Sequence, residues 1–119
     1  MRIITLGVVF STLLGLAGCA NQSSDLYLWN YYQPEVYEYL QSPEGDVQPQ
    51  ITKLEAVQED AKAANRALPP GFHAHLGLLY ARLGQADKAA IEFNTEKALF
   101  PESTAYMDFL LSNKKGVVQ

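Results

Sequence analysis

The sequence predicts a small all-helical domain, and three observations carry this prediction. Apolar residues recur every three or four positions in four segments, which is the spacing of one face of an α-helix. Proline and glycine residues separate these segments, where they end helices and form turns. The chain has 119 residues, of which 48% are hydrophobic, so it has room for one domain with a single core.

The N-terminal segment has the features of an export signal. Met1 and Arg2 precede a mostly apolar run, residues 3–16, which is too short to cross a bilayer as a stable helix. The run ends in Leu16, Ala17, Gly18 and Cys19, which resembles the lipobox of bacterial lipoproteins. By that resemblance the chain is cut before Cys19, whose thiol takes a diacylglycerol. The alternative is an ordinary secretory signal with an incidental cysteine, but an exposed thiol is a liability in an oxidising compartment.

This signal defines the expected organisation of the chain. Residues 1–18 are the signal peptide, 19–25 a lipidated tether, 26–113 one helical domain and 114–119 a loose tail. Without residues 1–18 the chain has 101 residues and a net charge of −5. Residue 20 is alanine and not aspartate, which by resemblance to proteobacterial lipoproteins favours the outer membrane. We expect attachment there through the lipid on Cys19, with the periplasmic face favoured over the cell surface.

Aromatic side chains gather directly after the tether. Tyr27, Trp29 and Tyr31 alternate, which predicts an extended segment with one aromatic face. Pro34 is then expected to open a helix that places Val36, Tyr37 and Leu40 on one side. Three roles are open: packing on the helical domain, contact with a protein partner, or contact with the membrane interface. The candidate interaction residues are Tyr27, Trp29, Tyr31, Tyr32, Tyr37 and Tyr39.

Four longer helices are expected after the turn at residues 42–46. The first covers 51–68, with Thr52 and Glu55 at capping-box spacing, or starts a turn earlier after Pro49. Pro69-Pro70-Gly71 ends it. The others cover 72–83, stopped by Gly84, then 87–99, followed by Pro101, and 102–113 with Tyr106, Met107, Leu110 and Leu111 on its apolar side.

Residues 72–101 resemble a tetratricopeptide repeat. The matching positions are Leu76, Gly77, Tyr80, Gly84, Ala89, Phe93 and Pro101. Gly77 and Ala89 are small enough for two antiparallel helices to approach closely, and Tyr80 and Phe93 fill the space beside them. His73 stands in place of an aromatic anchor and Glu96 in place of a small alanine. We therefore expect a solitary repeat-like pair covered by flanking helices, because a single repeat cannot bury its own faces.

Most of residues 25–112 also resemble one family of small bacterial lipoproteins, described as domain of unknown function 4810. The blocks that carry this resemblance are Tyr27-Leu28-Trp29, Val36 to Tyr39, Pro69 to Gly77, and Phe93 to Ser103. Members tend to be encoded beside a curli-channel-like lipoprotein and a further lipoprotein. The resemblance implies a role in a shared envelope assembly, and it brings no catalytic residues.

Few residues suggest a chemical site. His73 and His75 project about 200° apart on a helix, so they cannot hold one metal ion together. Glu92 and Glu96, like Glu55 and Glu59, are expected on solvated helix faces. Glu96 is the exception to watch, since its repeat position faces the packing seam. Its carboxylate would need a partner: Lys97, the Pro69-Pro70-Gly71 backbone or another protein.

The hydroxyls of Ser103 and Thr104 are expected to cap amides at the start of the last helix rather than to act as nucleophiles. A net charge of −4 without a basic cluster argues against a nucleic-acid partner. One cysteine excludes an intrachain disulfide and a cysteine-based zinc cluster. No catalytic motif is present, so we expect no enzyme, no metal and no cofactor.

The function expected from these observations is that of a non-enzymatic adaptor for another envelope protein, for which a companion lipoprotein is favoured. Two alternatives stay open. One is an accessory role in the synthesis of peptidoglycan or a surface polymer, by analogy with other repeat-bearing lipoproteins. The other is the binding of a small ligand.

Overall fold

The computed structural model of this chain describes residues 26–113. The signal peptide, the lipobox with Cys19, the tether and the C-terminal tail lie outside the described residues. The named elements of the described part are all helices, as the sequence predicts. Its elements are α2 (Tyr32–Gln41), α3 (Gln48–Ala63), α4 (Phe72–Arg82), α5 (Ala86–Leu99), the 3₁₀ turn η1 (Pro101–Ser103) and α6 (Thr104–Ser112).

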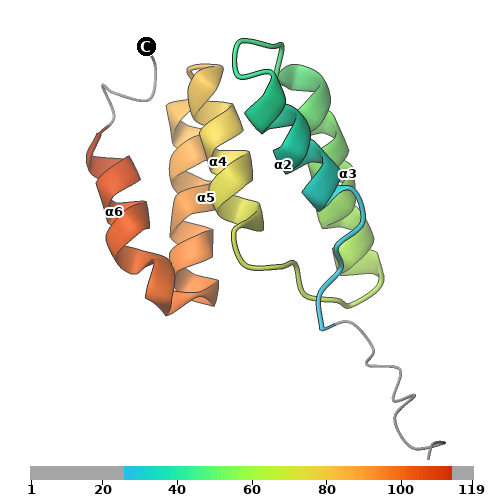
Figure 1. The fold of residues 1–119 in the computed structure, drawn as a ribbon. Helices are drawn as coiled ribbons and strands as arrows, with labels where there is room; N and C mark the ends of the chain where they lie inside the picture. Colours follow the sequence, from blue (N-terminus) through green and yellow to red (C-terminus); the bar gives the residue numbers. More distant parts are fainter. Residues whose placement is uncertain (1–25, 114–119) are drawn as a thin grey trace, which may run out of the picture.

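The helices form two neighbouring hairpins and one closing helix. In Figure 1, α2 and α4 lie in front while α3 and α5 lie behind them. The hairpin of α4 and α5 is the most closely packed pair, and α6 lies along α5. As a result, α6 and the α2–α3 hairpin stand on opposite sides of the array (Figure 1).

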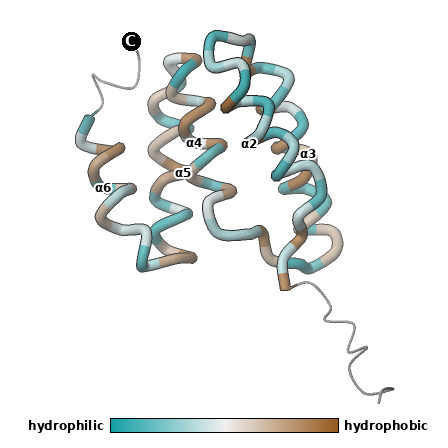
Figure 2. The backbone as a smooth tube through the Cα atoms, in the orientation of Figure 1, coloured by the Kyte–Doolittle hydropathy of each residue, from teal (hydrophilic) through white to brown (hydrophobic). Residues whose placement is uncertain are grey.

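One hydrophobic core joins α3, α4, α5 and α6. Hydrophobic and hydrophilic residues interchange along the helices, as expected when each helix buries one side (Figure 2). The central helix, α4, buries eight of its eleven residues. The core is built from Val47, Ile51, Leu54, Val57, Phe72, Leu76, Leu79, Tyr80, Ala81, Ala89, Phe93, Met107 and Leu110.

The turn between α4 and α5 contains the predicted glycine stop. Gly84 adopts a left-handed conformation with φ of 72°, which glycine accepts without steric cost. Gly77 lies directly beneath the ring of Phe93, and a Cβ atom added there would be 2.5 Å from Phe93 Cε1. The predicted close approach of the two helices at Gly77 is therefore confirmed.

The start of α3 differs from the predicted capping box. The helix begins at Gln48 with Pro49 in its first turn, which agrees with the earlier start considered above. Thr52 lies one turn inside the helix, where its hydroxyl donates to the Gln48 carbonyl. The side chain of Asp46 accepts instead from the Gln48 N–H at 3.0 Å. The capping role assigned to Thr52 and Glu55 is therefore wrong.

The end of α3 is also earlier than predicted, at Ala63 rather than Leu68. Asn65 takes a left-handed conformation with φ of 49°. The N–H groups of Asn65 and Arg66 then donate to the carbonyls of Lys62 and Ala61. These two bonds form a Schellman-type helix end, in which asparagine takes the position that glycine more often occupies.

The side of α2 that carries Tyr37 and Leu40 faces solvent and not the core. Tyr37 and Leu40 are 64% and 70% exposed. The inward side instead carries Tyr32, Glu35 and Tyr39, which recur at helical spacing. Tyr32 and Tyr39 lie two turns apart and both contact α4, so burial of these two rings sets the rotation of the helix.

The extended aromatic segment is shorter than predicted. Tyr27 forms a parallel bridge with Ala67, whose carbonyl accepts from the Leu28 N–H at 2.8 Å. Asn30 turns the chain with φ of 28°, and Tyr31 already caps α2. The alternating residues therefore do not form one extended face.

The last predicted helix is divided into η1 and α6. Met107 and Leu110 are buried as predicted, but Tyr106 is 56% exposed, so its place in the apolar face is wrong. Ser103 and Thr104 do not cap amides. Their hydroxyls donate to the carbonyls of Phe100 and Pro101, because the 3₁₀ turn brings those acceptors within reach.

Candidate functional site

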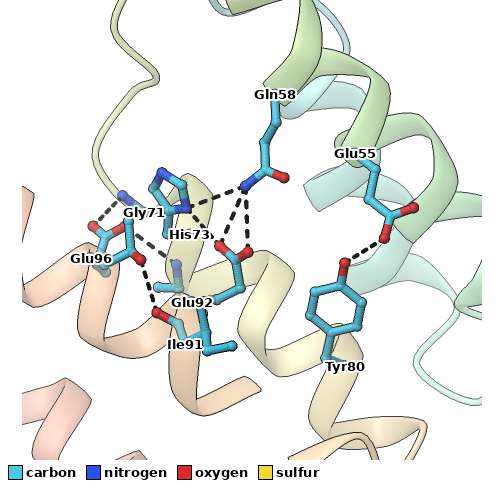
Figure 3. A network of polar contacts seen from close by, with 10 residues as sticks. Glu55, Gln58, Gly71, His73, Tyr80, Ile91, Glu92 and Glu96 are labelled. Carbon is cyan, nitrogen blue, oxygen red and sulfur yellow. Dashed lines mark hydrogen bonds and ion pairs between the residues drawn. The ribbon is translucent and has the colours of Figure 1, made fainter. Parts of the chain in front are cut away.

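Glu96 of α5 holds the start of α4. Its carboxylate accepts from the Gly71 N–H at 2.7 Å and from the Ala74 N–H at 3.3 Å (Figure 3). The residue is only 2% exposed. Free N–H groups at a helix start need acceptors and favour a negative charge, and Gly71, the N-cap residue, has no side chain to supply either. Of the three partners considered for Glu96, the Pro69-Pro70-Gly71 backbone is the one observed.

Glu92, one turn earlier on α5, contacts His73 of α4. The distance between His73 Nδ1 and Glu92 Oε2 is 2.6 Å, and both side chains are largely buried. A carboxylate can only accept, so Nδ1 carries the proton and donates it. The solvated position expected for Glu92 is therefore wrong, because it faces α4, whereas Glu96 faces the packing seam as considered above.

Gln58 extends this contact to α3. Its Nε2 lies 3.5 Å from each carboxylate oxygen of Glu92 and 3.5 Å from His73 Nδ1. Figure 3 shows His73 and Glu92 turned toward the Gln58 amide. Since Nε2 and Nδ1 are both donors here, the amide binds Glu92. We call Gln58, His73 and Glu92 the polar junction, because it joins three helices through side chains.

The polar junction forms one wall of an open groove of about 730 Å³. Leu68, Leu99 and Phe100 are among the apolar residues of its lining. Tyr27 also lines it, and Arg66 donates to the Tyr27 carbonyl at 2.9 Å. Among residues 26–113 no group of three or more His, Cys, Asp or Glu side chains could hold a metal ion. The one carboxylate of this lining, that of Glu92, is engaged with His73 of α4 and Gln58 of α3.

A second polar contact joins α3 and α4 through Tyr80, whose hydroxyl donates to Glu55 at 2.5 Å. Burial and the nearby Glu55 carboxylate raise the pKa of Tyr80, and the Lys88 ammonium lies 5.0 Å from its ring centre. Glu55 is thus engaged with the core, whereas Glu59 pairs with Lys62 at the surface. Glu55 and Glu59 were both expected to face solvent. This is confirmed for Glu59 and wrong for Glu55.

The candidate aromatic residues divide between packing and exposure. Tyr32 and Tyr39 pack inward, and burial raises the pKa of Tyr32, with a further contribution from the Glu96 charge. Tyr27 and Trp29 contact one another edge to face, and Tyr27 also contacts Phe100. Tyr31 and Tyr37 remain 65% and 64% exposed. The structure therefore uses some of these rings in the domain and leaves Tyr31, Tyr37 and part of Trp29 facing solvent.

Among the polar residues at the contact of α2 with its neighbours, Glu35, Gln50 and Arg82 were not singled out by the sequence pattern. Glu35 is 3% exposed and accepts from Lys53 at 2.8 Å. The resulting bond raises the pKa of Lys53. Four buried side-chain atoms in the described part of the chain have no hydrogen-bond partner: Glu35 Oε2, Gln50 Oε1, His75 Nε2 and Arg82 Nη1. Spacing along one helix could not reveal them, because their burial depends on how α2 lies against its neighbours.

His75 is one of these residues, and it packs as expected for a core histidine. Its ring contacts Tyr32 and Tyr39 at centroid distances of 6.2 and 5.2 Å. Burial lowers the pKa of His75 to about 4, compared with its usual 6.5. The imidazole is therefore neutral in the folded protein at neutral pH.

Replacing His75 with phenylalanine is expected to flatten the dependence of stability on pH. The unfolded chain binds a proton on His75 more readily than the folded chain does. The neutral His75 ring therefore supports folding above pH 6.5. That support is lost as the pH falls toward 4, by about 2 kcal/mol between pH 7 and pH 5. Urea unfolding at both pH values measures this difference. An equal loss of stability in the two proteins would contradict the assignment.

These features define a small all-helical domain whose buried polar groups join its own helices. The chain belongs to the family described as Domain of unknown function (DUF4810), whose model matches residues 26–110. No match exists among curated proteins or among solved structures. Within residues 26–113 no helix is both long enough and apolar enough to cross a membrane.

Proposed function

We propose that this protein is a lipid-anchored, non-enzymatic adaptor of the outer membrane that docks another envelope protein. Cys19 is the anchor, within the lipobox-like sequence at residues 16–19. The observation that carries the adaptor role is a set of exposed, mostly aromatic side chains that follow the predicted tether in the sequence. We call this the α2 surface, and it consists of Leu26, Trp29, Tyr31, Tyr37 and Leu40, which are 37% to 84% exposed.

The kind of residue on the α2 surface favours a protein partner. Tyrosine and tryptophan are enriched at protein interfaces, where they supply large contact areas with little loss of side-chain freedom. Tyr37 is held in place by the Gln41 amide, which donates to its hydroxyl at 2.6 Å. By contrast, the acidic residues that could support catalysis are bound within the domain. The α2 surface is therefore the best docking site in this part of the chain.

The helical array fits an adaptor of the tetratricopeptide kind. The α4–α5 hairpin carries the repeat-like positions, and the α2–α3 hairpin lies beside it with the same order of front and back helices (Figure 1). We assign α6 as the first helix of a further, incomplete unit. In this assignment the α4–α5 hairpin supports the α2–α3 hairpin, which presents the α2 surface at one edge of the array.

A photo-reactive residue at position 37 is expected to capture one protein partner in intact cells at native expression. The same residue at position 59 is the matched control, because Glu59 is an exposed α3 residue outside the α2 surface. The Cys19→Ser variant, which lacks the acylated thiol, is expected to leave the membrane and lose the adduct. Immunoblotting and mass spectrometry of the adducts measure both results.

Two outcomes would overturn the proposed function. One is the absence of any adduct from position 37 while the protein is present at native level. The other is the same set of adducts from positions 37 and 59, which would mean non-specific contact. A Cys19→Ser protein that stays in the membrane and is still shortened would show that the anchor is not at Cys19.

A further inference from the structure

The opposite edge of the array carries a second exposed apolar face, on α6. Tyr106 and Phe109 are 56% and 57% exposed. Their rings stack on one another, with 6.4 Å between centroids and an interplanar angle of 14°. Met107 and Leu110 face the core, so the aromatic pair lies on the side of α6 that its own domain leaves uncovered. An outermost helix of a helical array normally has a polar outer side.

The residues on this side follow the spacing of a helix–helix seam. Glu102, Tyr106, Phe109 and Asn113 are separated by four, three and four positions, and all four are exposed. This is the order of the contact positions in paired helices. We call these four residues the α6 seam; Glu102 belongs to the preceding turn η1, and Asn113 directly follows α6.

The α6 seam is also symmetrical in character, since polar residues stand at both ends and aromatic residues in the middle. A two-fold axis between Tyr106 and Phe109 would place Tyr106 of one chain on Phe109 of another in an antiparallel pair. The same axis would place the Glu102 carboxylate, an acceptor, beside the Asn113 amide, a donor. A two-fold contact requires such self-complementarity, because the same surface is used twice.

We propose that α6 is a dimer seam, on which the α6 of a second copy of this chain packs in antiparallel orientation. The seam matches itself at each of its four positions, which a surface made for an unrelated helix or for lipid does not need to do. It also lies on the opposite side of the array from the α2–α3 hairpin (Figure 1). One short helix buries little area, so the dimer is weak and is favoured by confinement of the copies to one membrane.

Cysteine cross-linking of the full chain in cells tests this orientation. Two differently tagged copies, one with Glu102→Cys and one with Asn113→Cys, are expected to form a mixed disulfide dimer. Either variant alone is expected to give much less, because antiparallel packing keeps identical positions apart. The Asp108→Cys variant is the control: Asp108 is exposed, but it pairs with Lys97 on another side of α6. The chain without an added cysteine controls for Cys19.

Matched serine variants then test whether the cross-link depends on the aromatic residues of the α6 seam. Tyr106→Ser together with Phe109→Ser is expected to abolish the mixed dimer. Tyr37→Ser, which removes a similarly exposed tyrosine from the α2 surface, is expected to leave it unchanged. Circular dichroism checks that both variants retain the helical fold, as expected for exposed positions.

Three results would overturn the proposal. These are a stronger dimer from either single variant than from the mixture, a cross-link from position 102 to a different protein, or a mixed dimer that survives loss of both aromatic rings. None of them bears on the proposed adaptor function, which depends on the α2 surface and is read out by a different probe.

Discussion

Replacing Glu96 with alanine is expected to lower the free energy of unfolding by about 4 kcal/mol, because two partly buried N–H groups lose their acceptor at about 1–3 kcal/mol each. The groups are those of Gly71 and Ala74 at the start of α4. Water cannot easily replace the carboxylate, since Glu96 is only 2% exposed. The loss also removes a negative charge from the positive end of the central helix.

Urea denaturation of the intact chain measures this loss. Glu96→Gln keeps one acceptor but turns an amide donor toward the N–H groups, so its stability should lie between those of the other two proteins. Glu59→Ala is the matched control: its surface pair with Lys62 contributes at most about 0.5 kcal/mol. If Glu96→Ala and Glu59→Ala were equally stable, the capping role of Glu96 would be refuted.

Glu96 also shows how far the sequence could lead toward the site. Its departure from the repeat pattern identified it as a carboxylate in need of a partner, and the backbone at Gly71 was among the candidates. The choice among them could not be made from spacing, because Gly71 is 25 positions away. Glu92 was missed for a related reason. Its contact with His73 depends on the rotation of α5 against α4, whereas four-residue spacing only puts the two glutamates on one face.

The helix stops of the fold could be predicted where the stopping residue is proline or glycine. Gly84 and Pro101 mark the ends of their helices as expected. The end of α3 was placed too late because Asn65 takes the left-handed conformation, and asparagine adopts it too rarely for the sequence to mark a stop. The apolar spacing that continued to Leu68 therefore suggested a longer helix.

The orientation of α2 could not be predicted, because tyrosines occur on both of its sides. Tyr32 and Tyr39 lie inward while Tyr37 lies outward, although each is a tyrosine in the same helix. A tyrosine ring fits either a core or an exposed surface. The contacts with Phe72 and His75 decide between them, and those contacts exist only in the folded chain.

Replacing Gly77 with valine is expected to lower the free energy of unfolding by about 3 kcal/mol through overpacking. A Cβ atom at this position would lie 2.5 Å from Phe93 Cε1 and 2.7 Å from its Cδ1. Phe93 is 3% exposed and is surrounded by the core, so its ring cannot move aside without displacing α5 from α4. Glycine is unfavourable inside a helix by about 1 kcal/mol relative to alanine, so the close packing outweighs a gain in helix propensity.

A smaller side chain at position 93 tests whether the cost of Gly77→Val comes from the clash with Phe93 or from a general intolerance of α4 to substitution. In a Phe93→Leu background the space beside Gly77 widens, and Gly77→Val should cost at least about 1 kcal/mol less than it does in the original chain. Gly84→Ala is the glycine control, because nothing lies within 4 Å of a Cβ added there. Its cost is limited to the strain of a left-handed conformation, about 1 kcal/mol. An equal cost of Gly77→Val in both backgrounds would mean that Phe93 does not set the distance between the two helices.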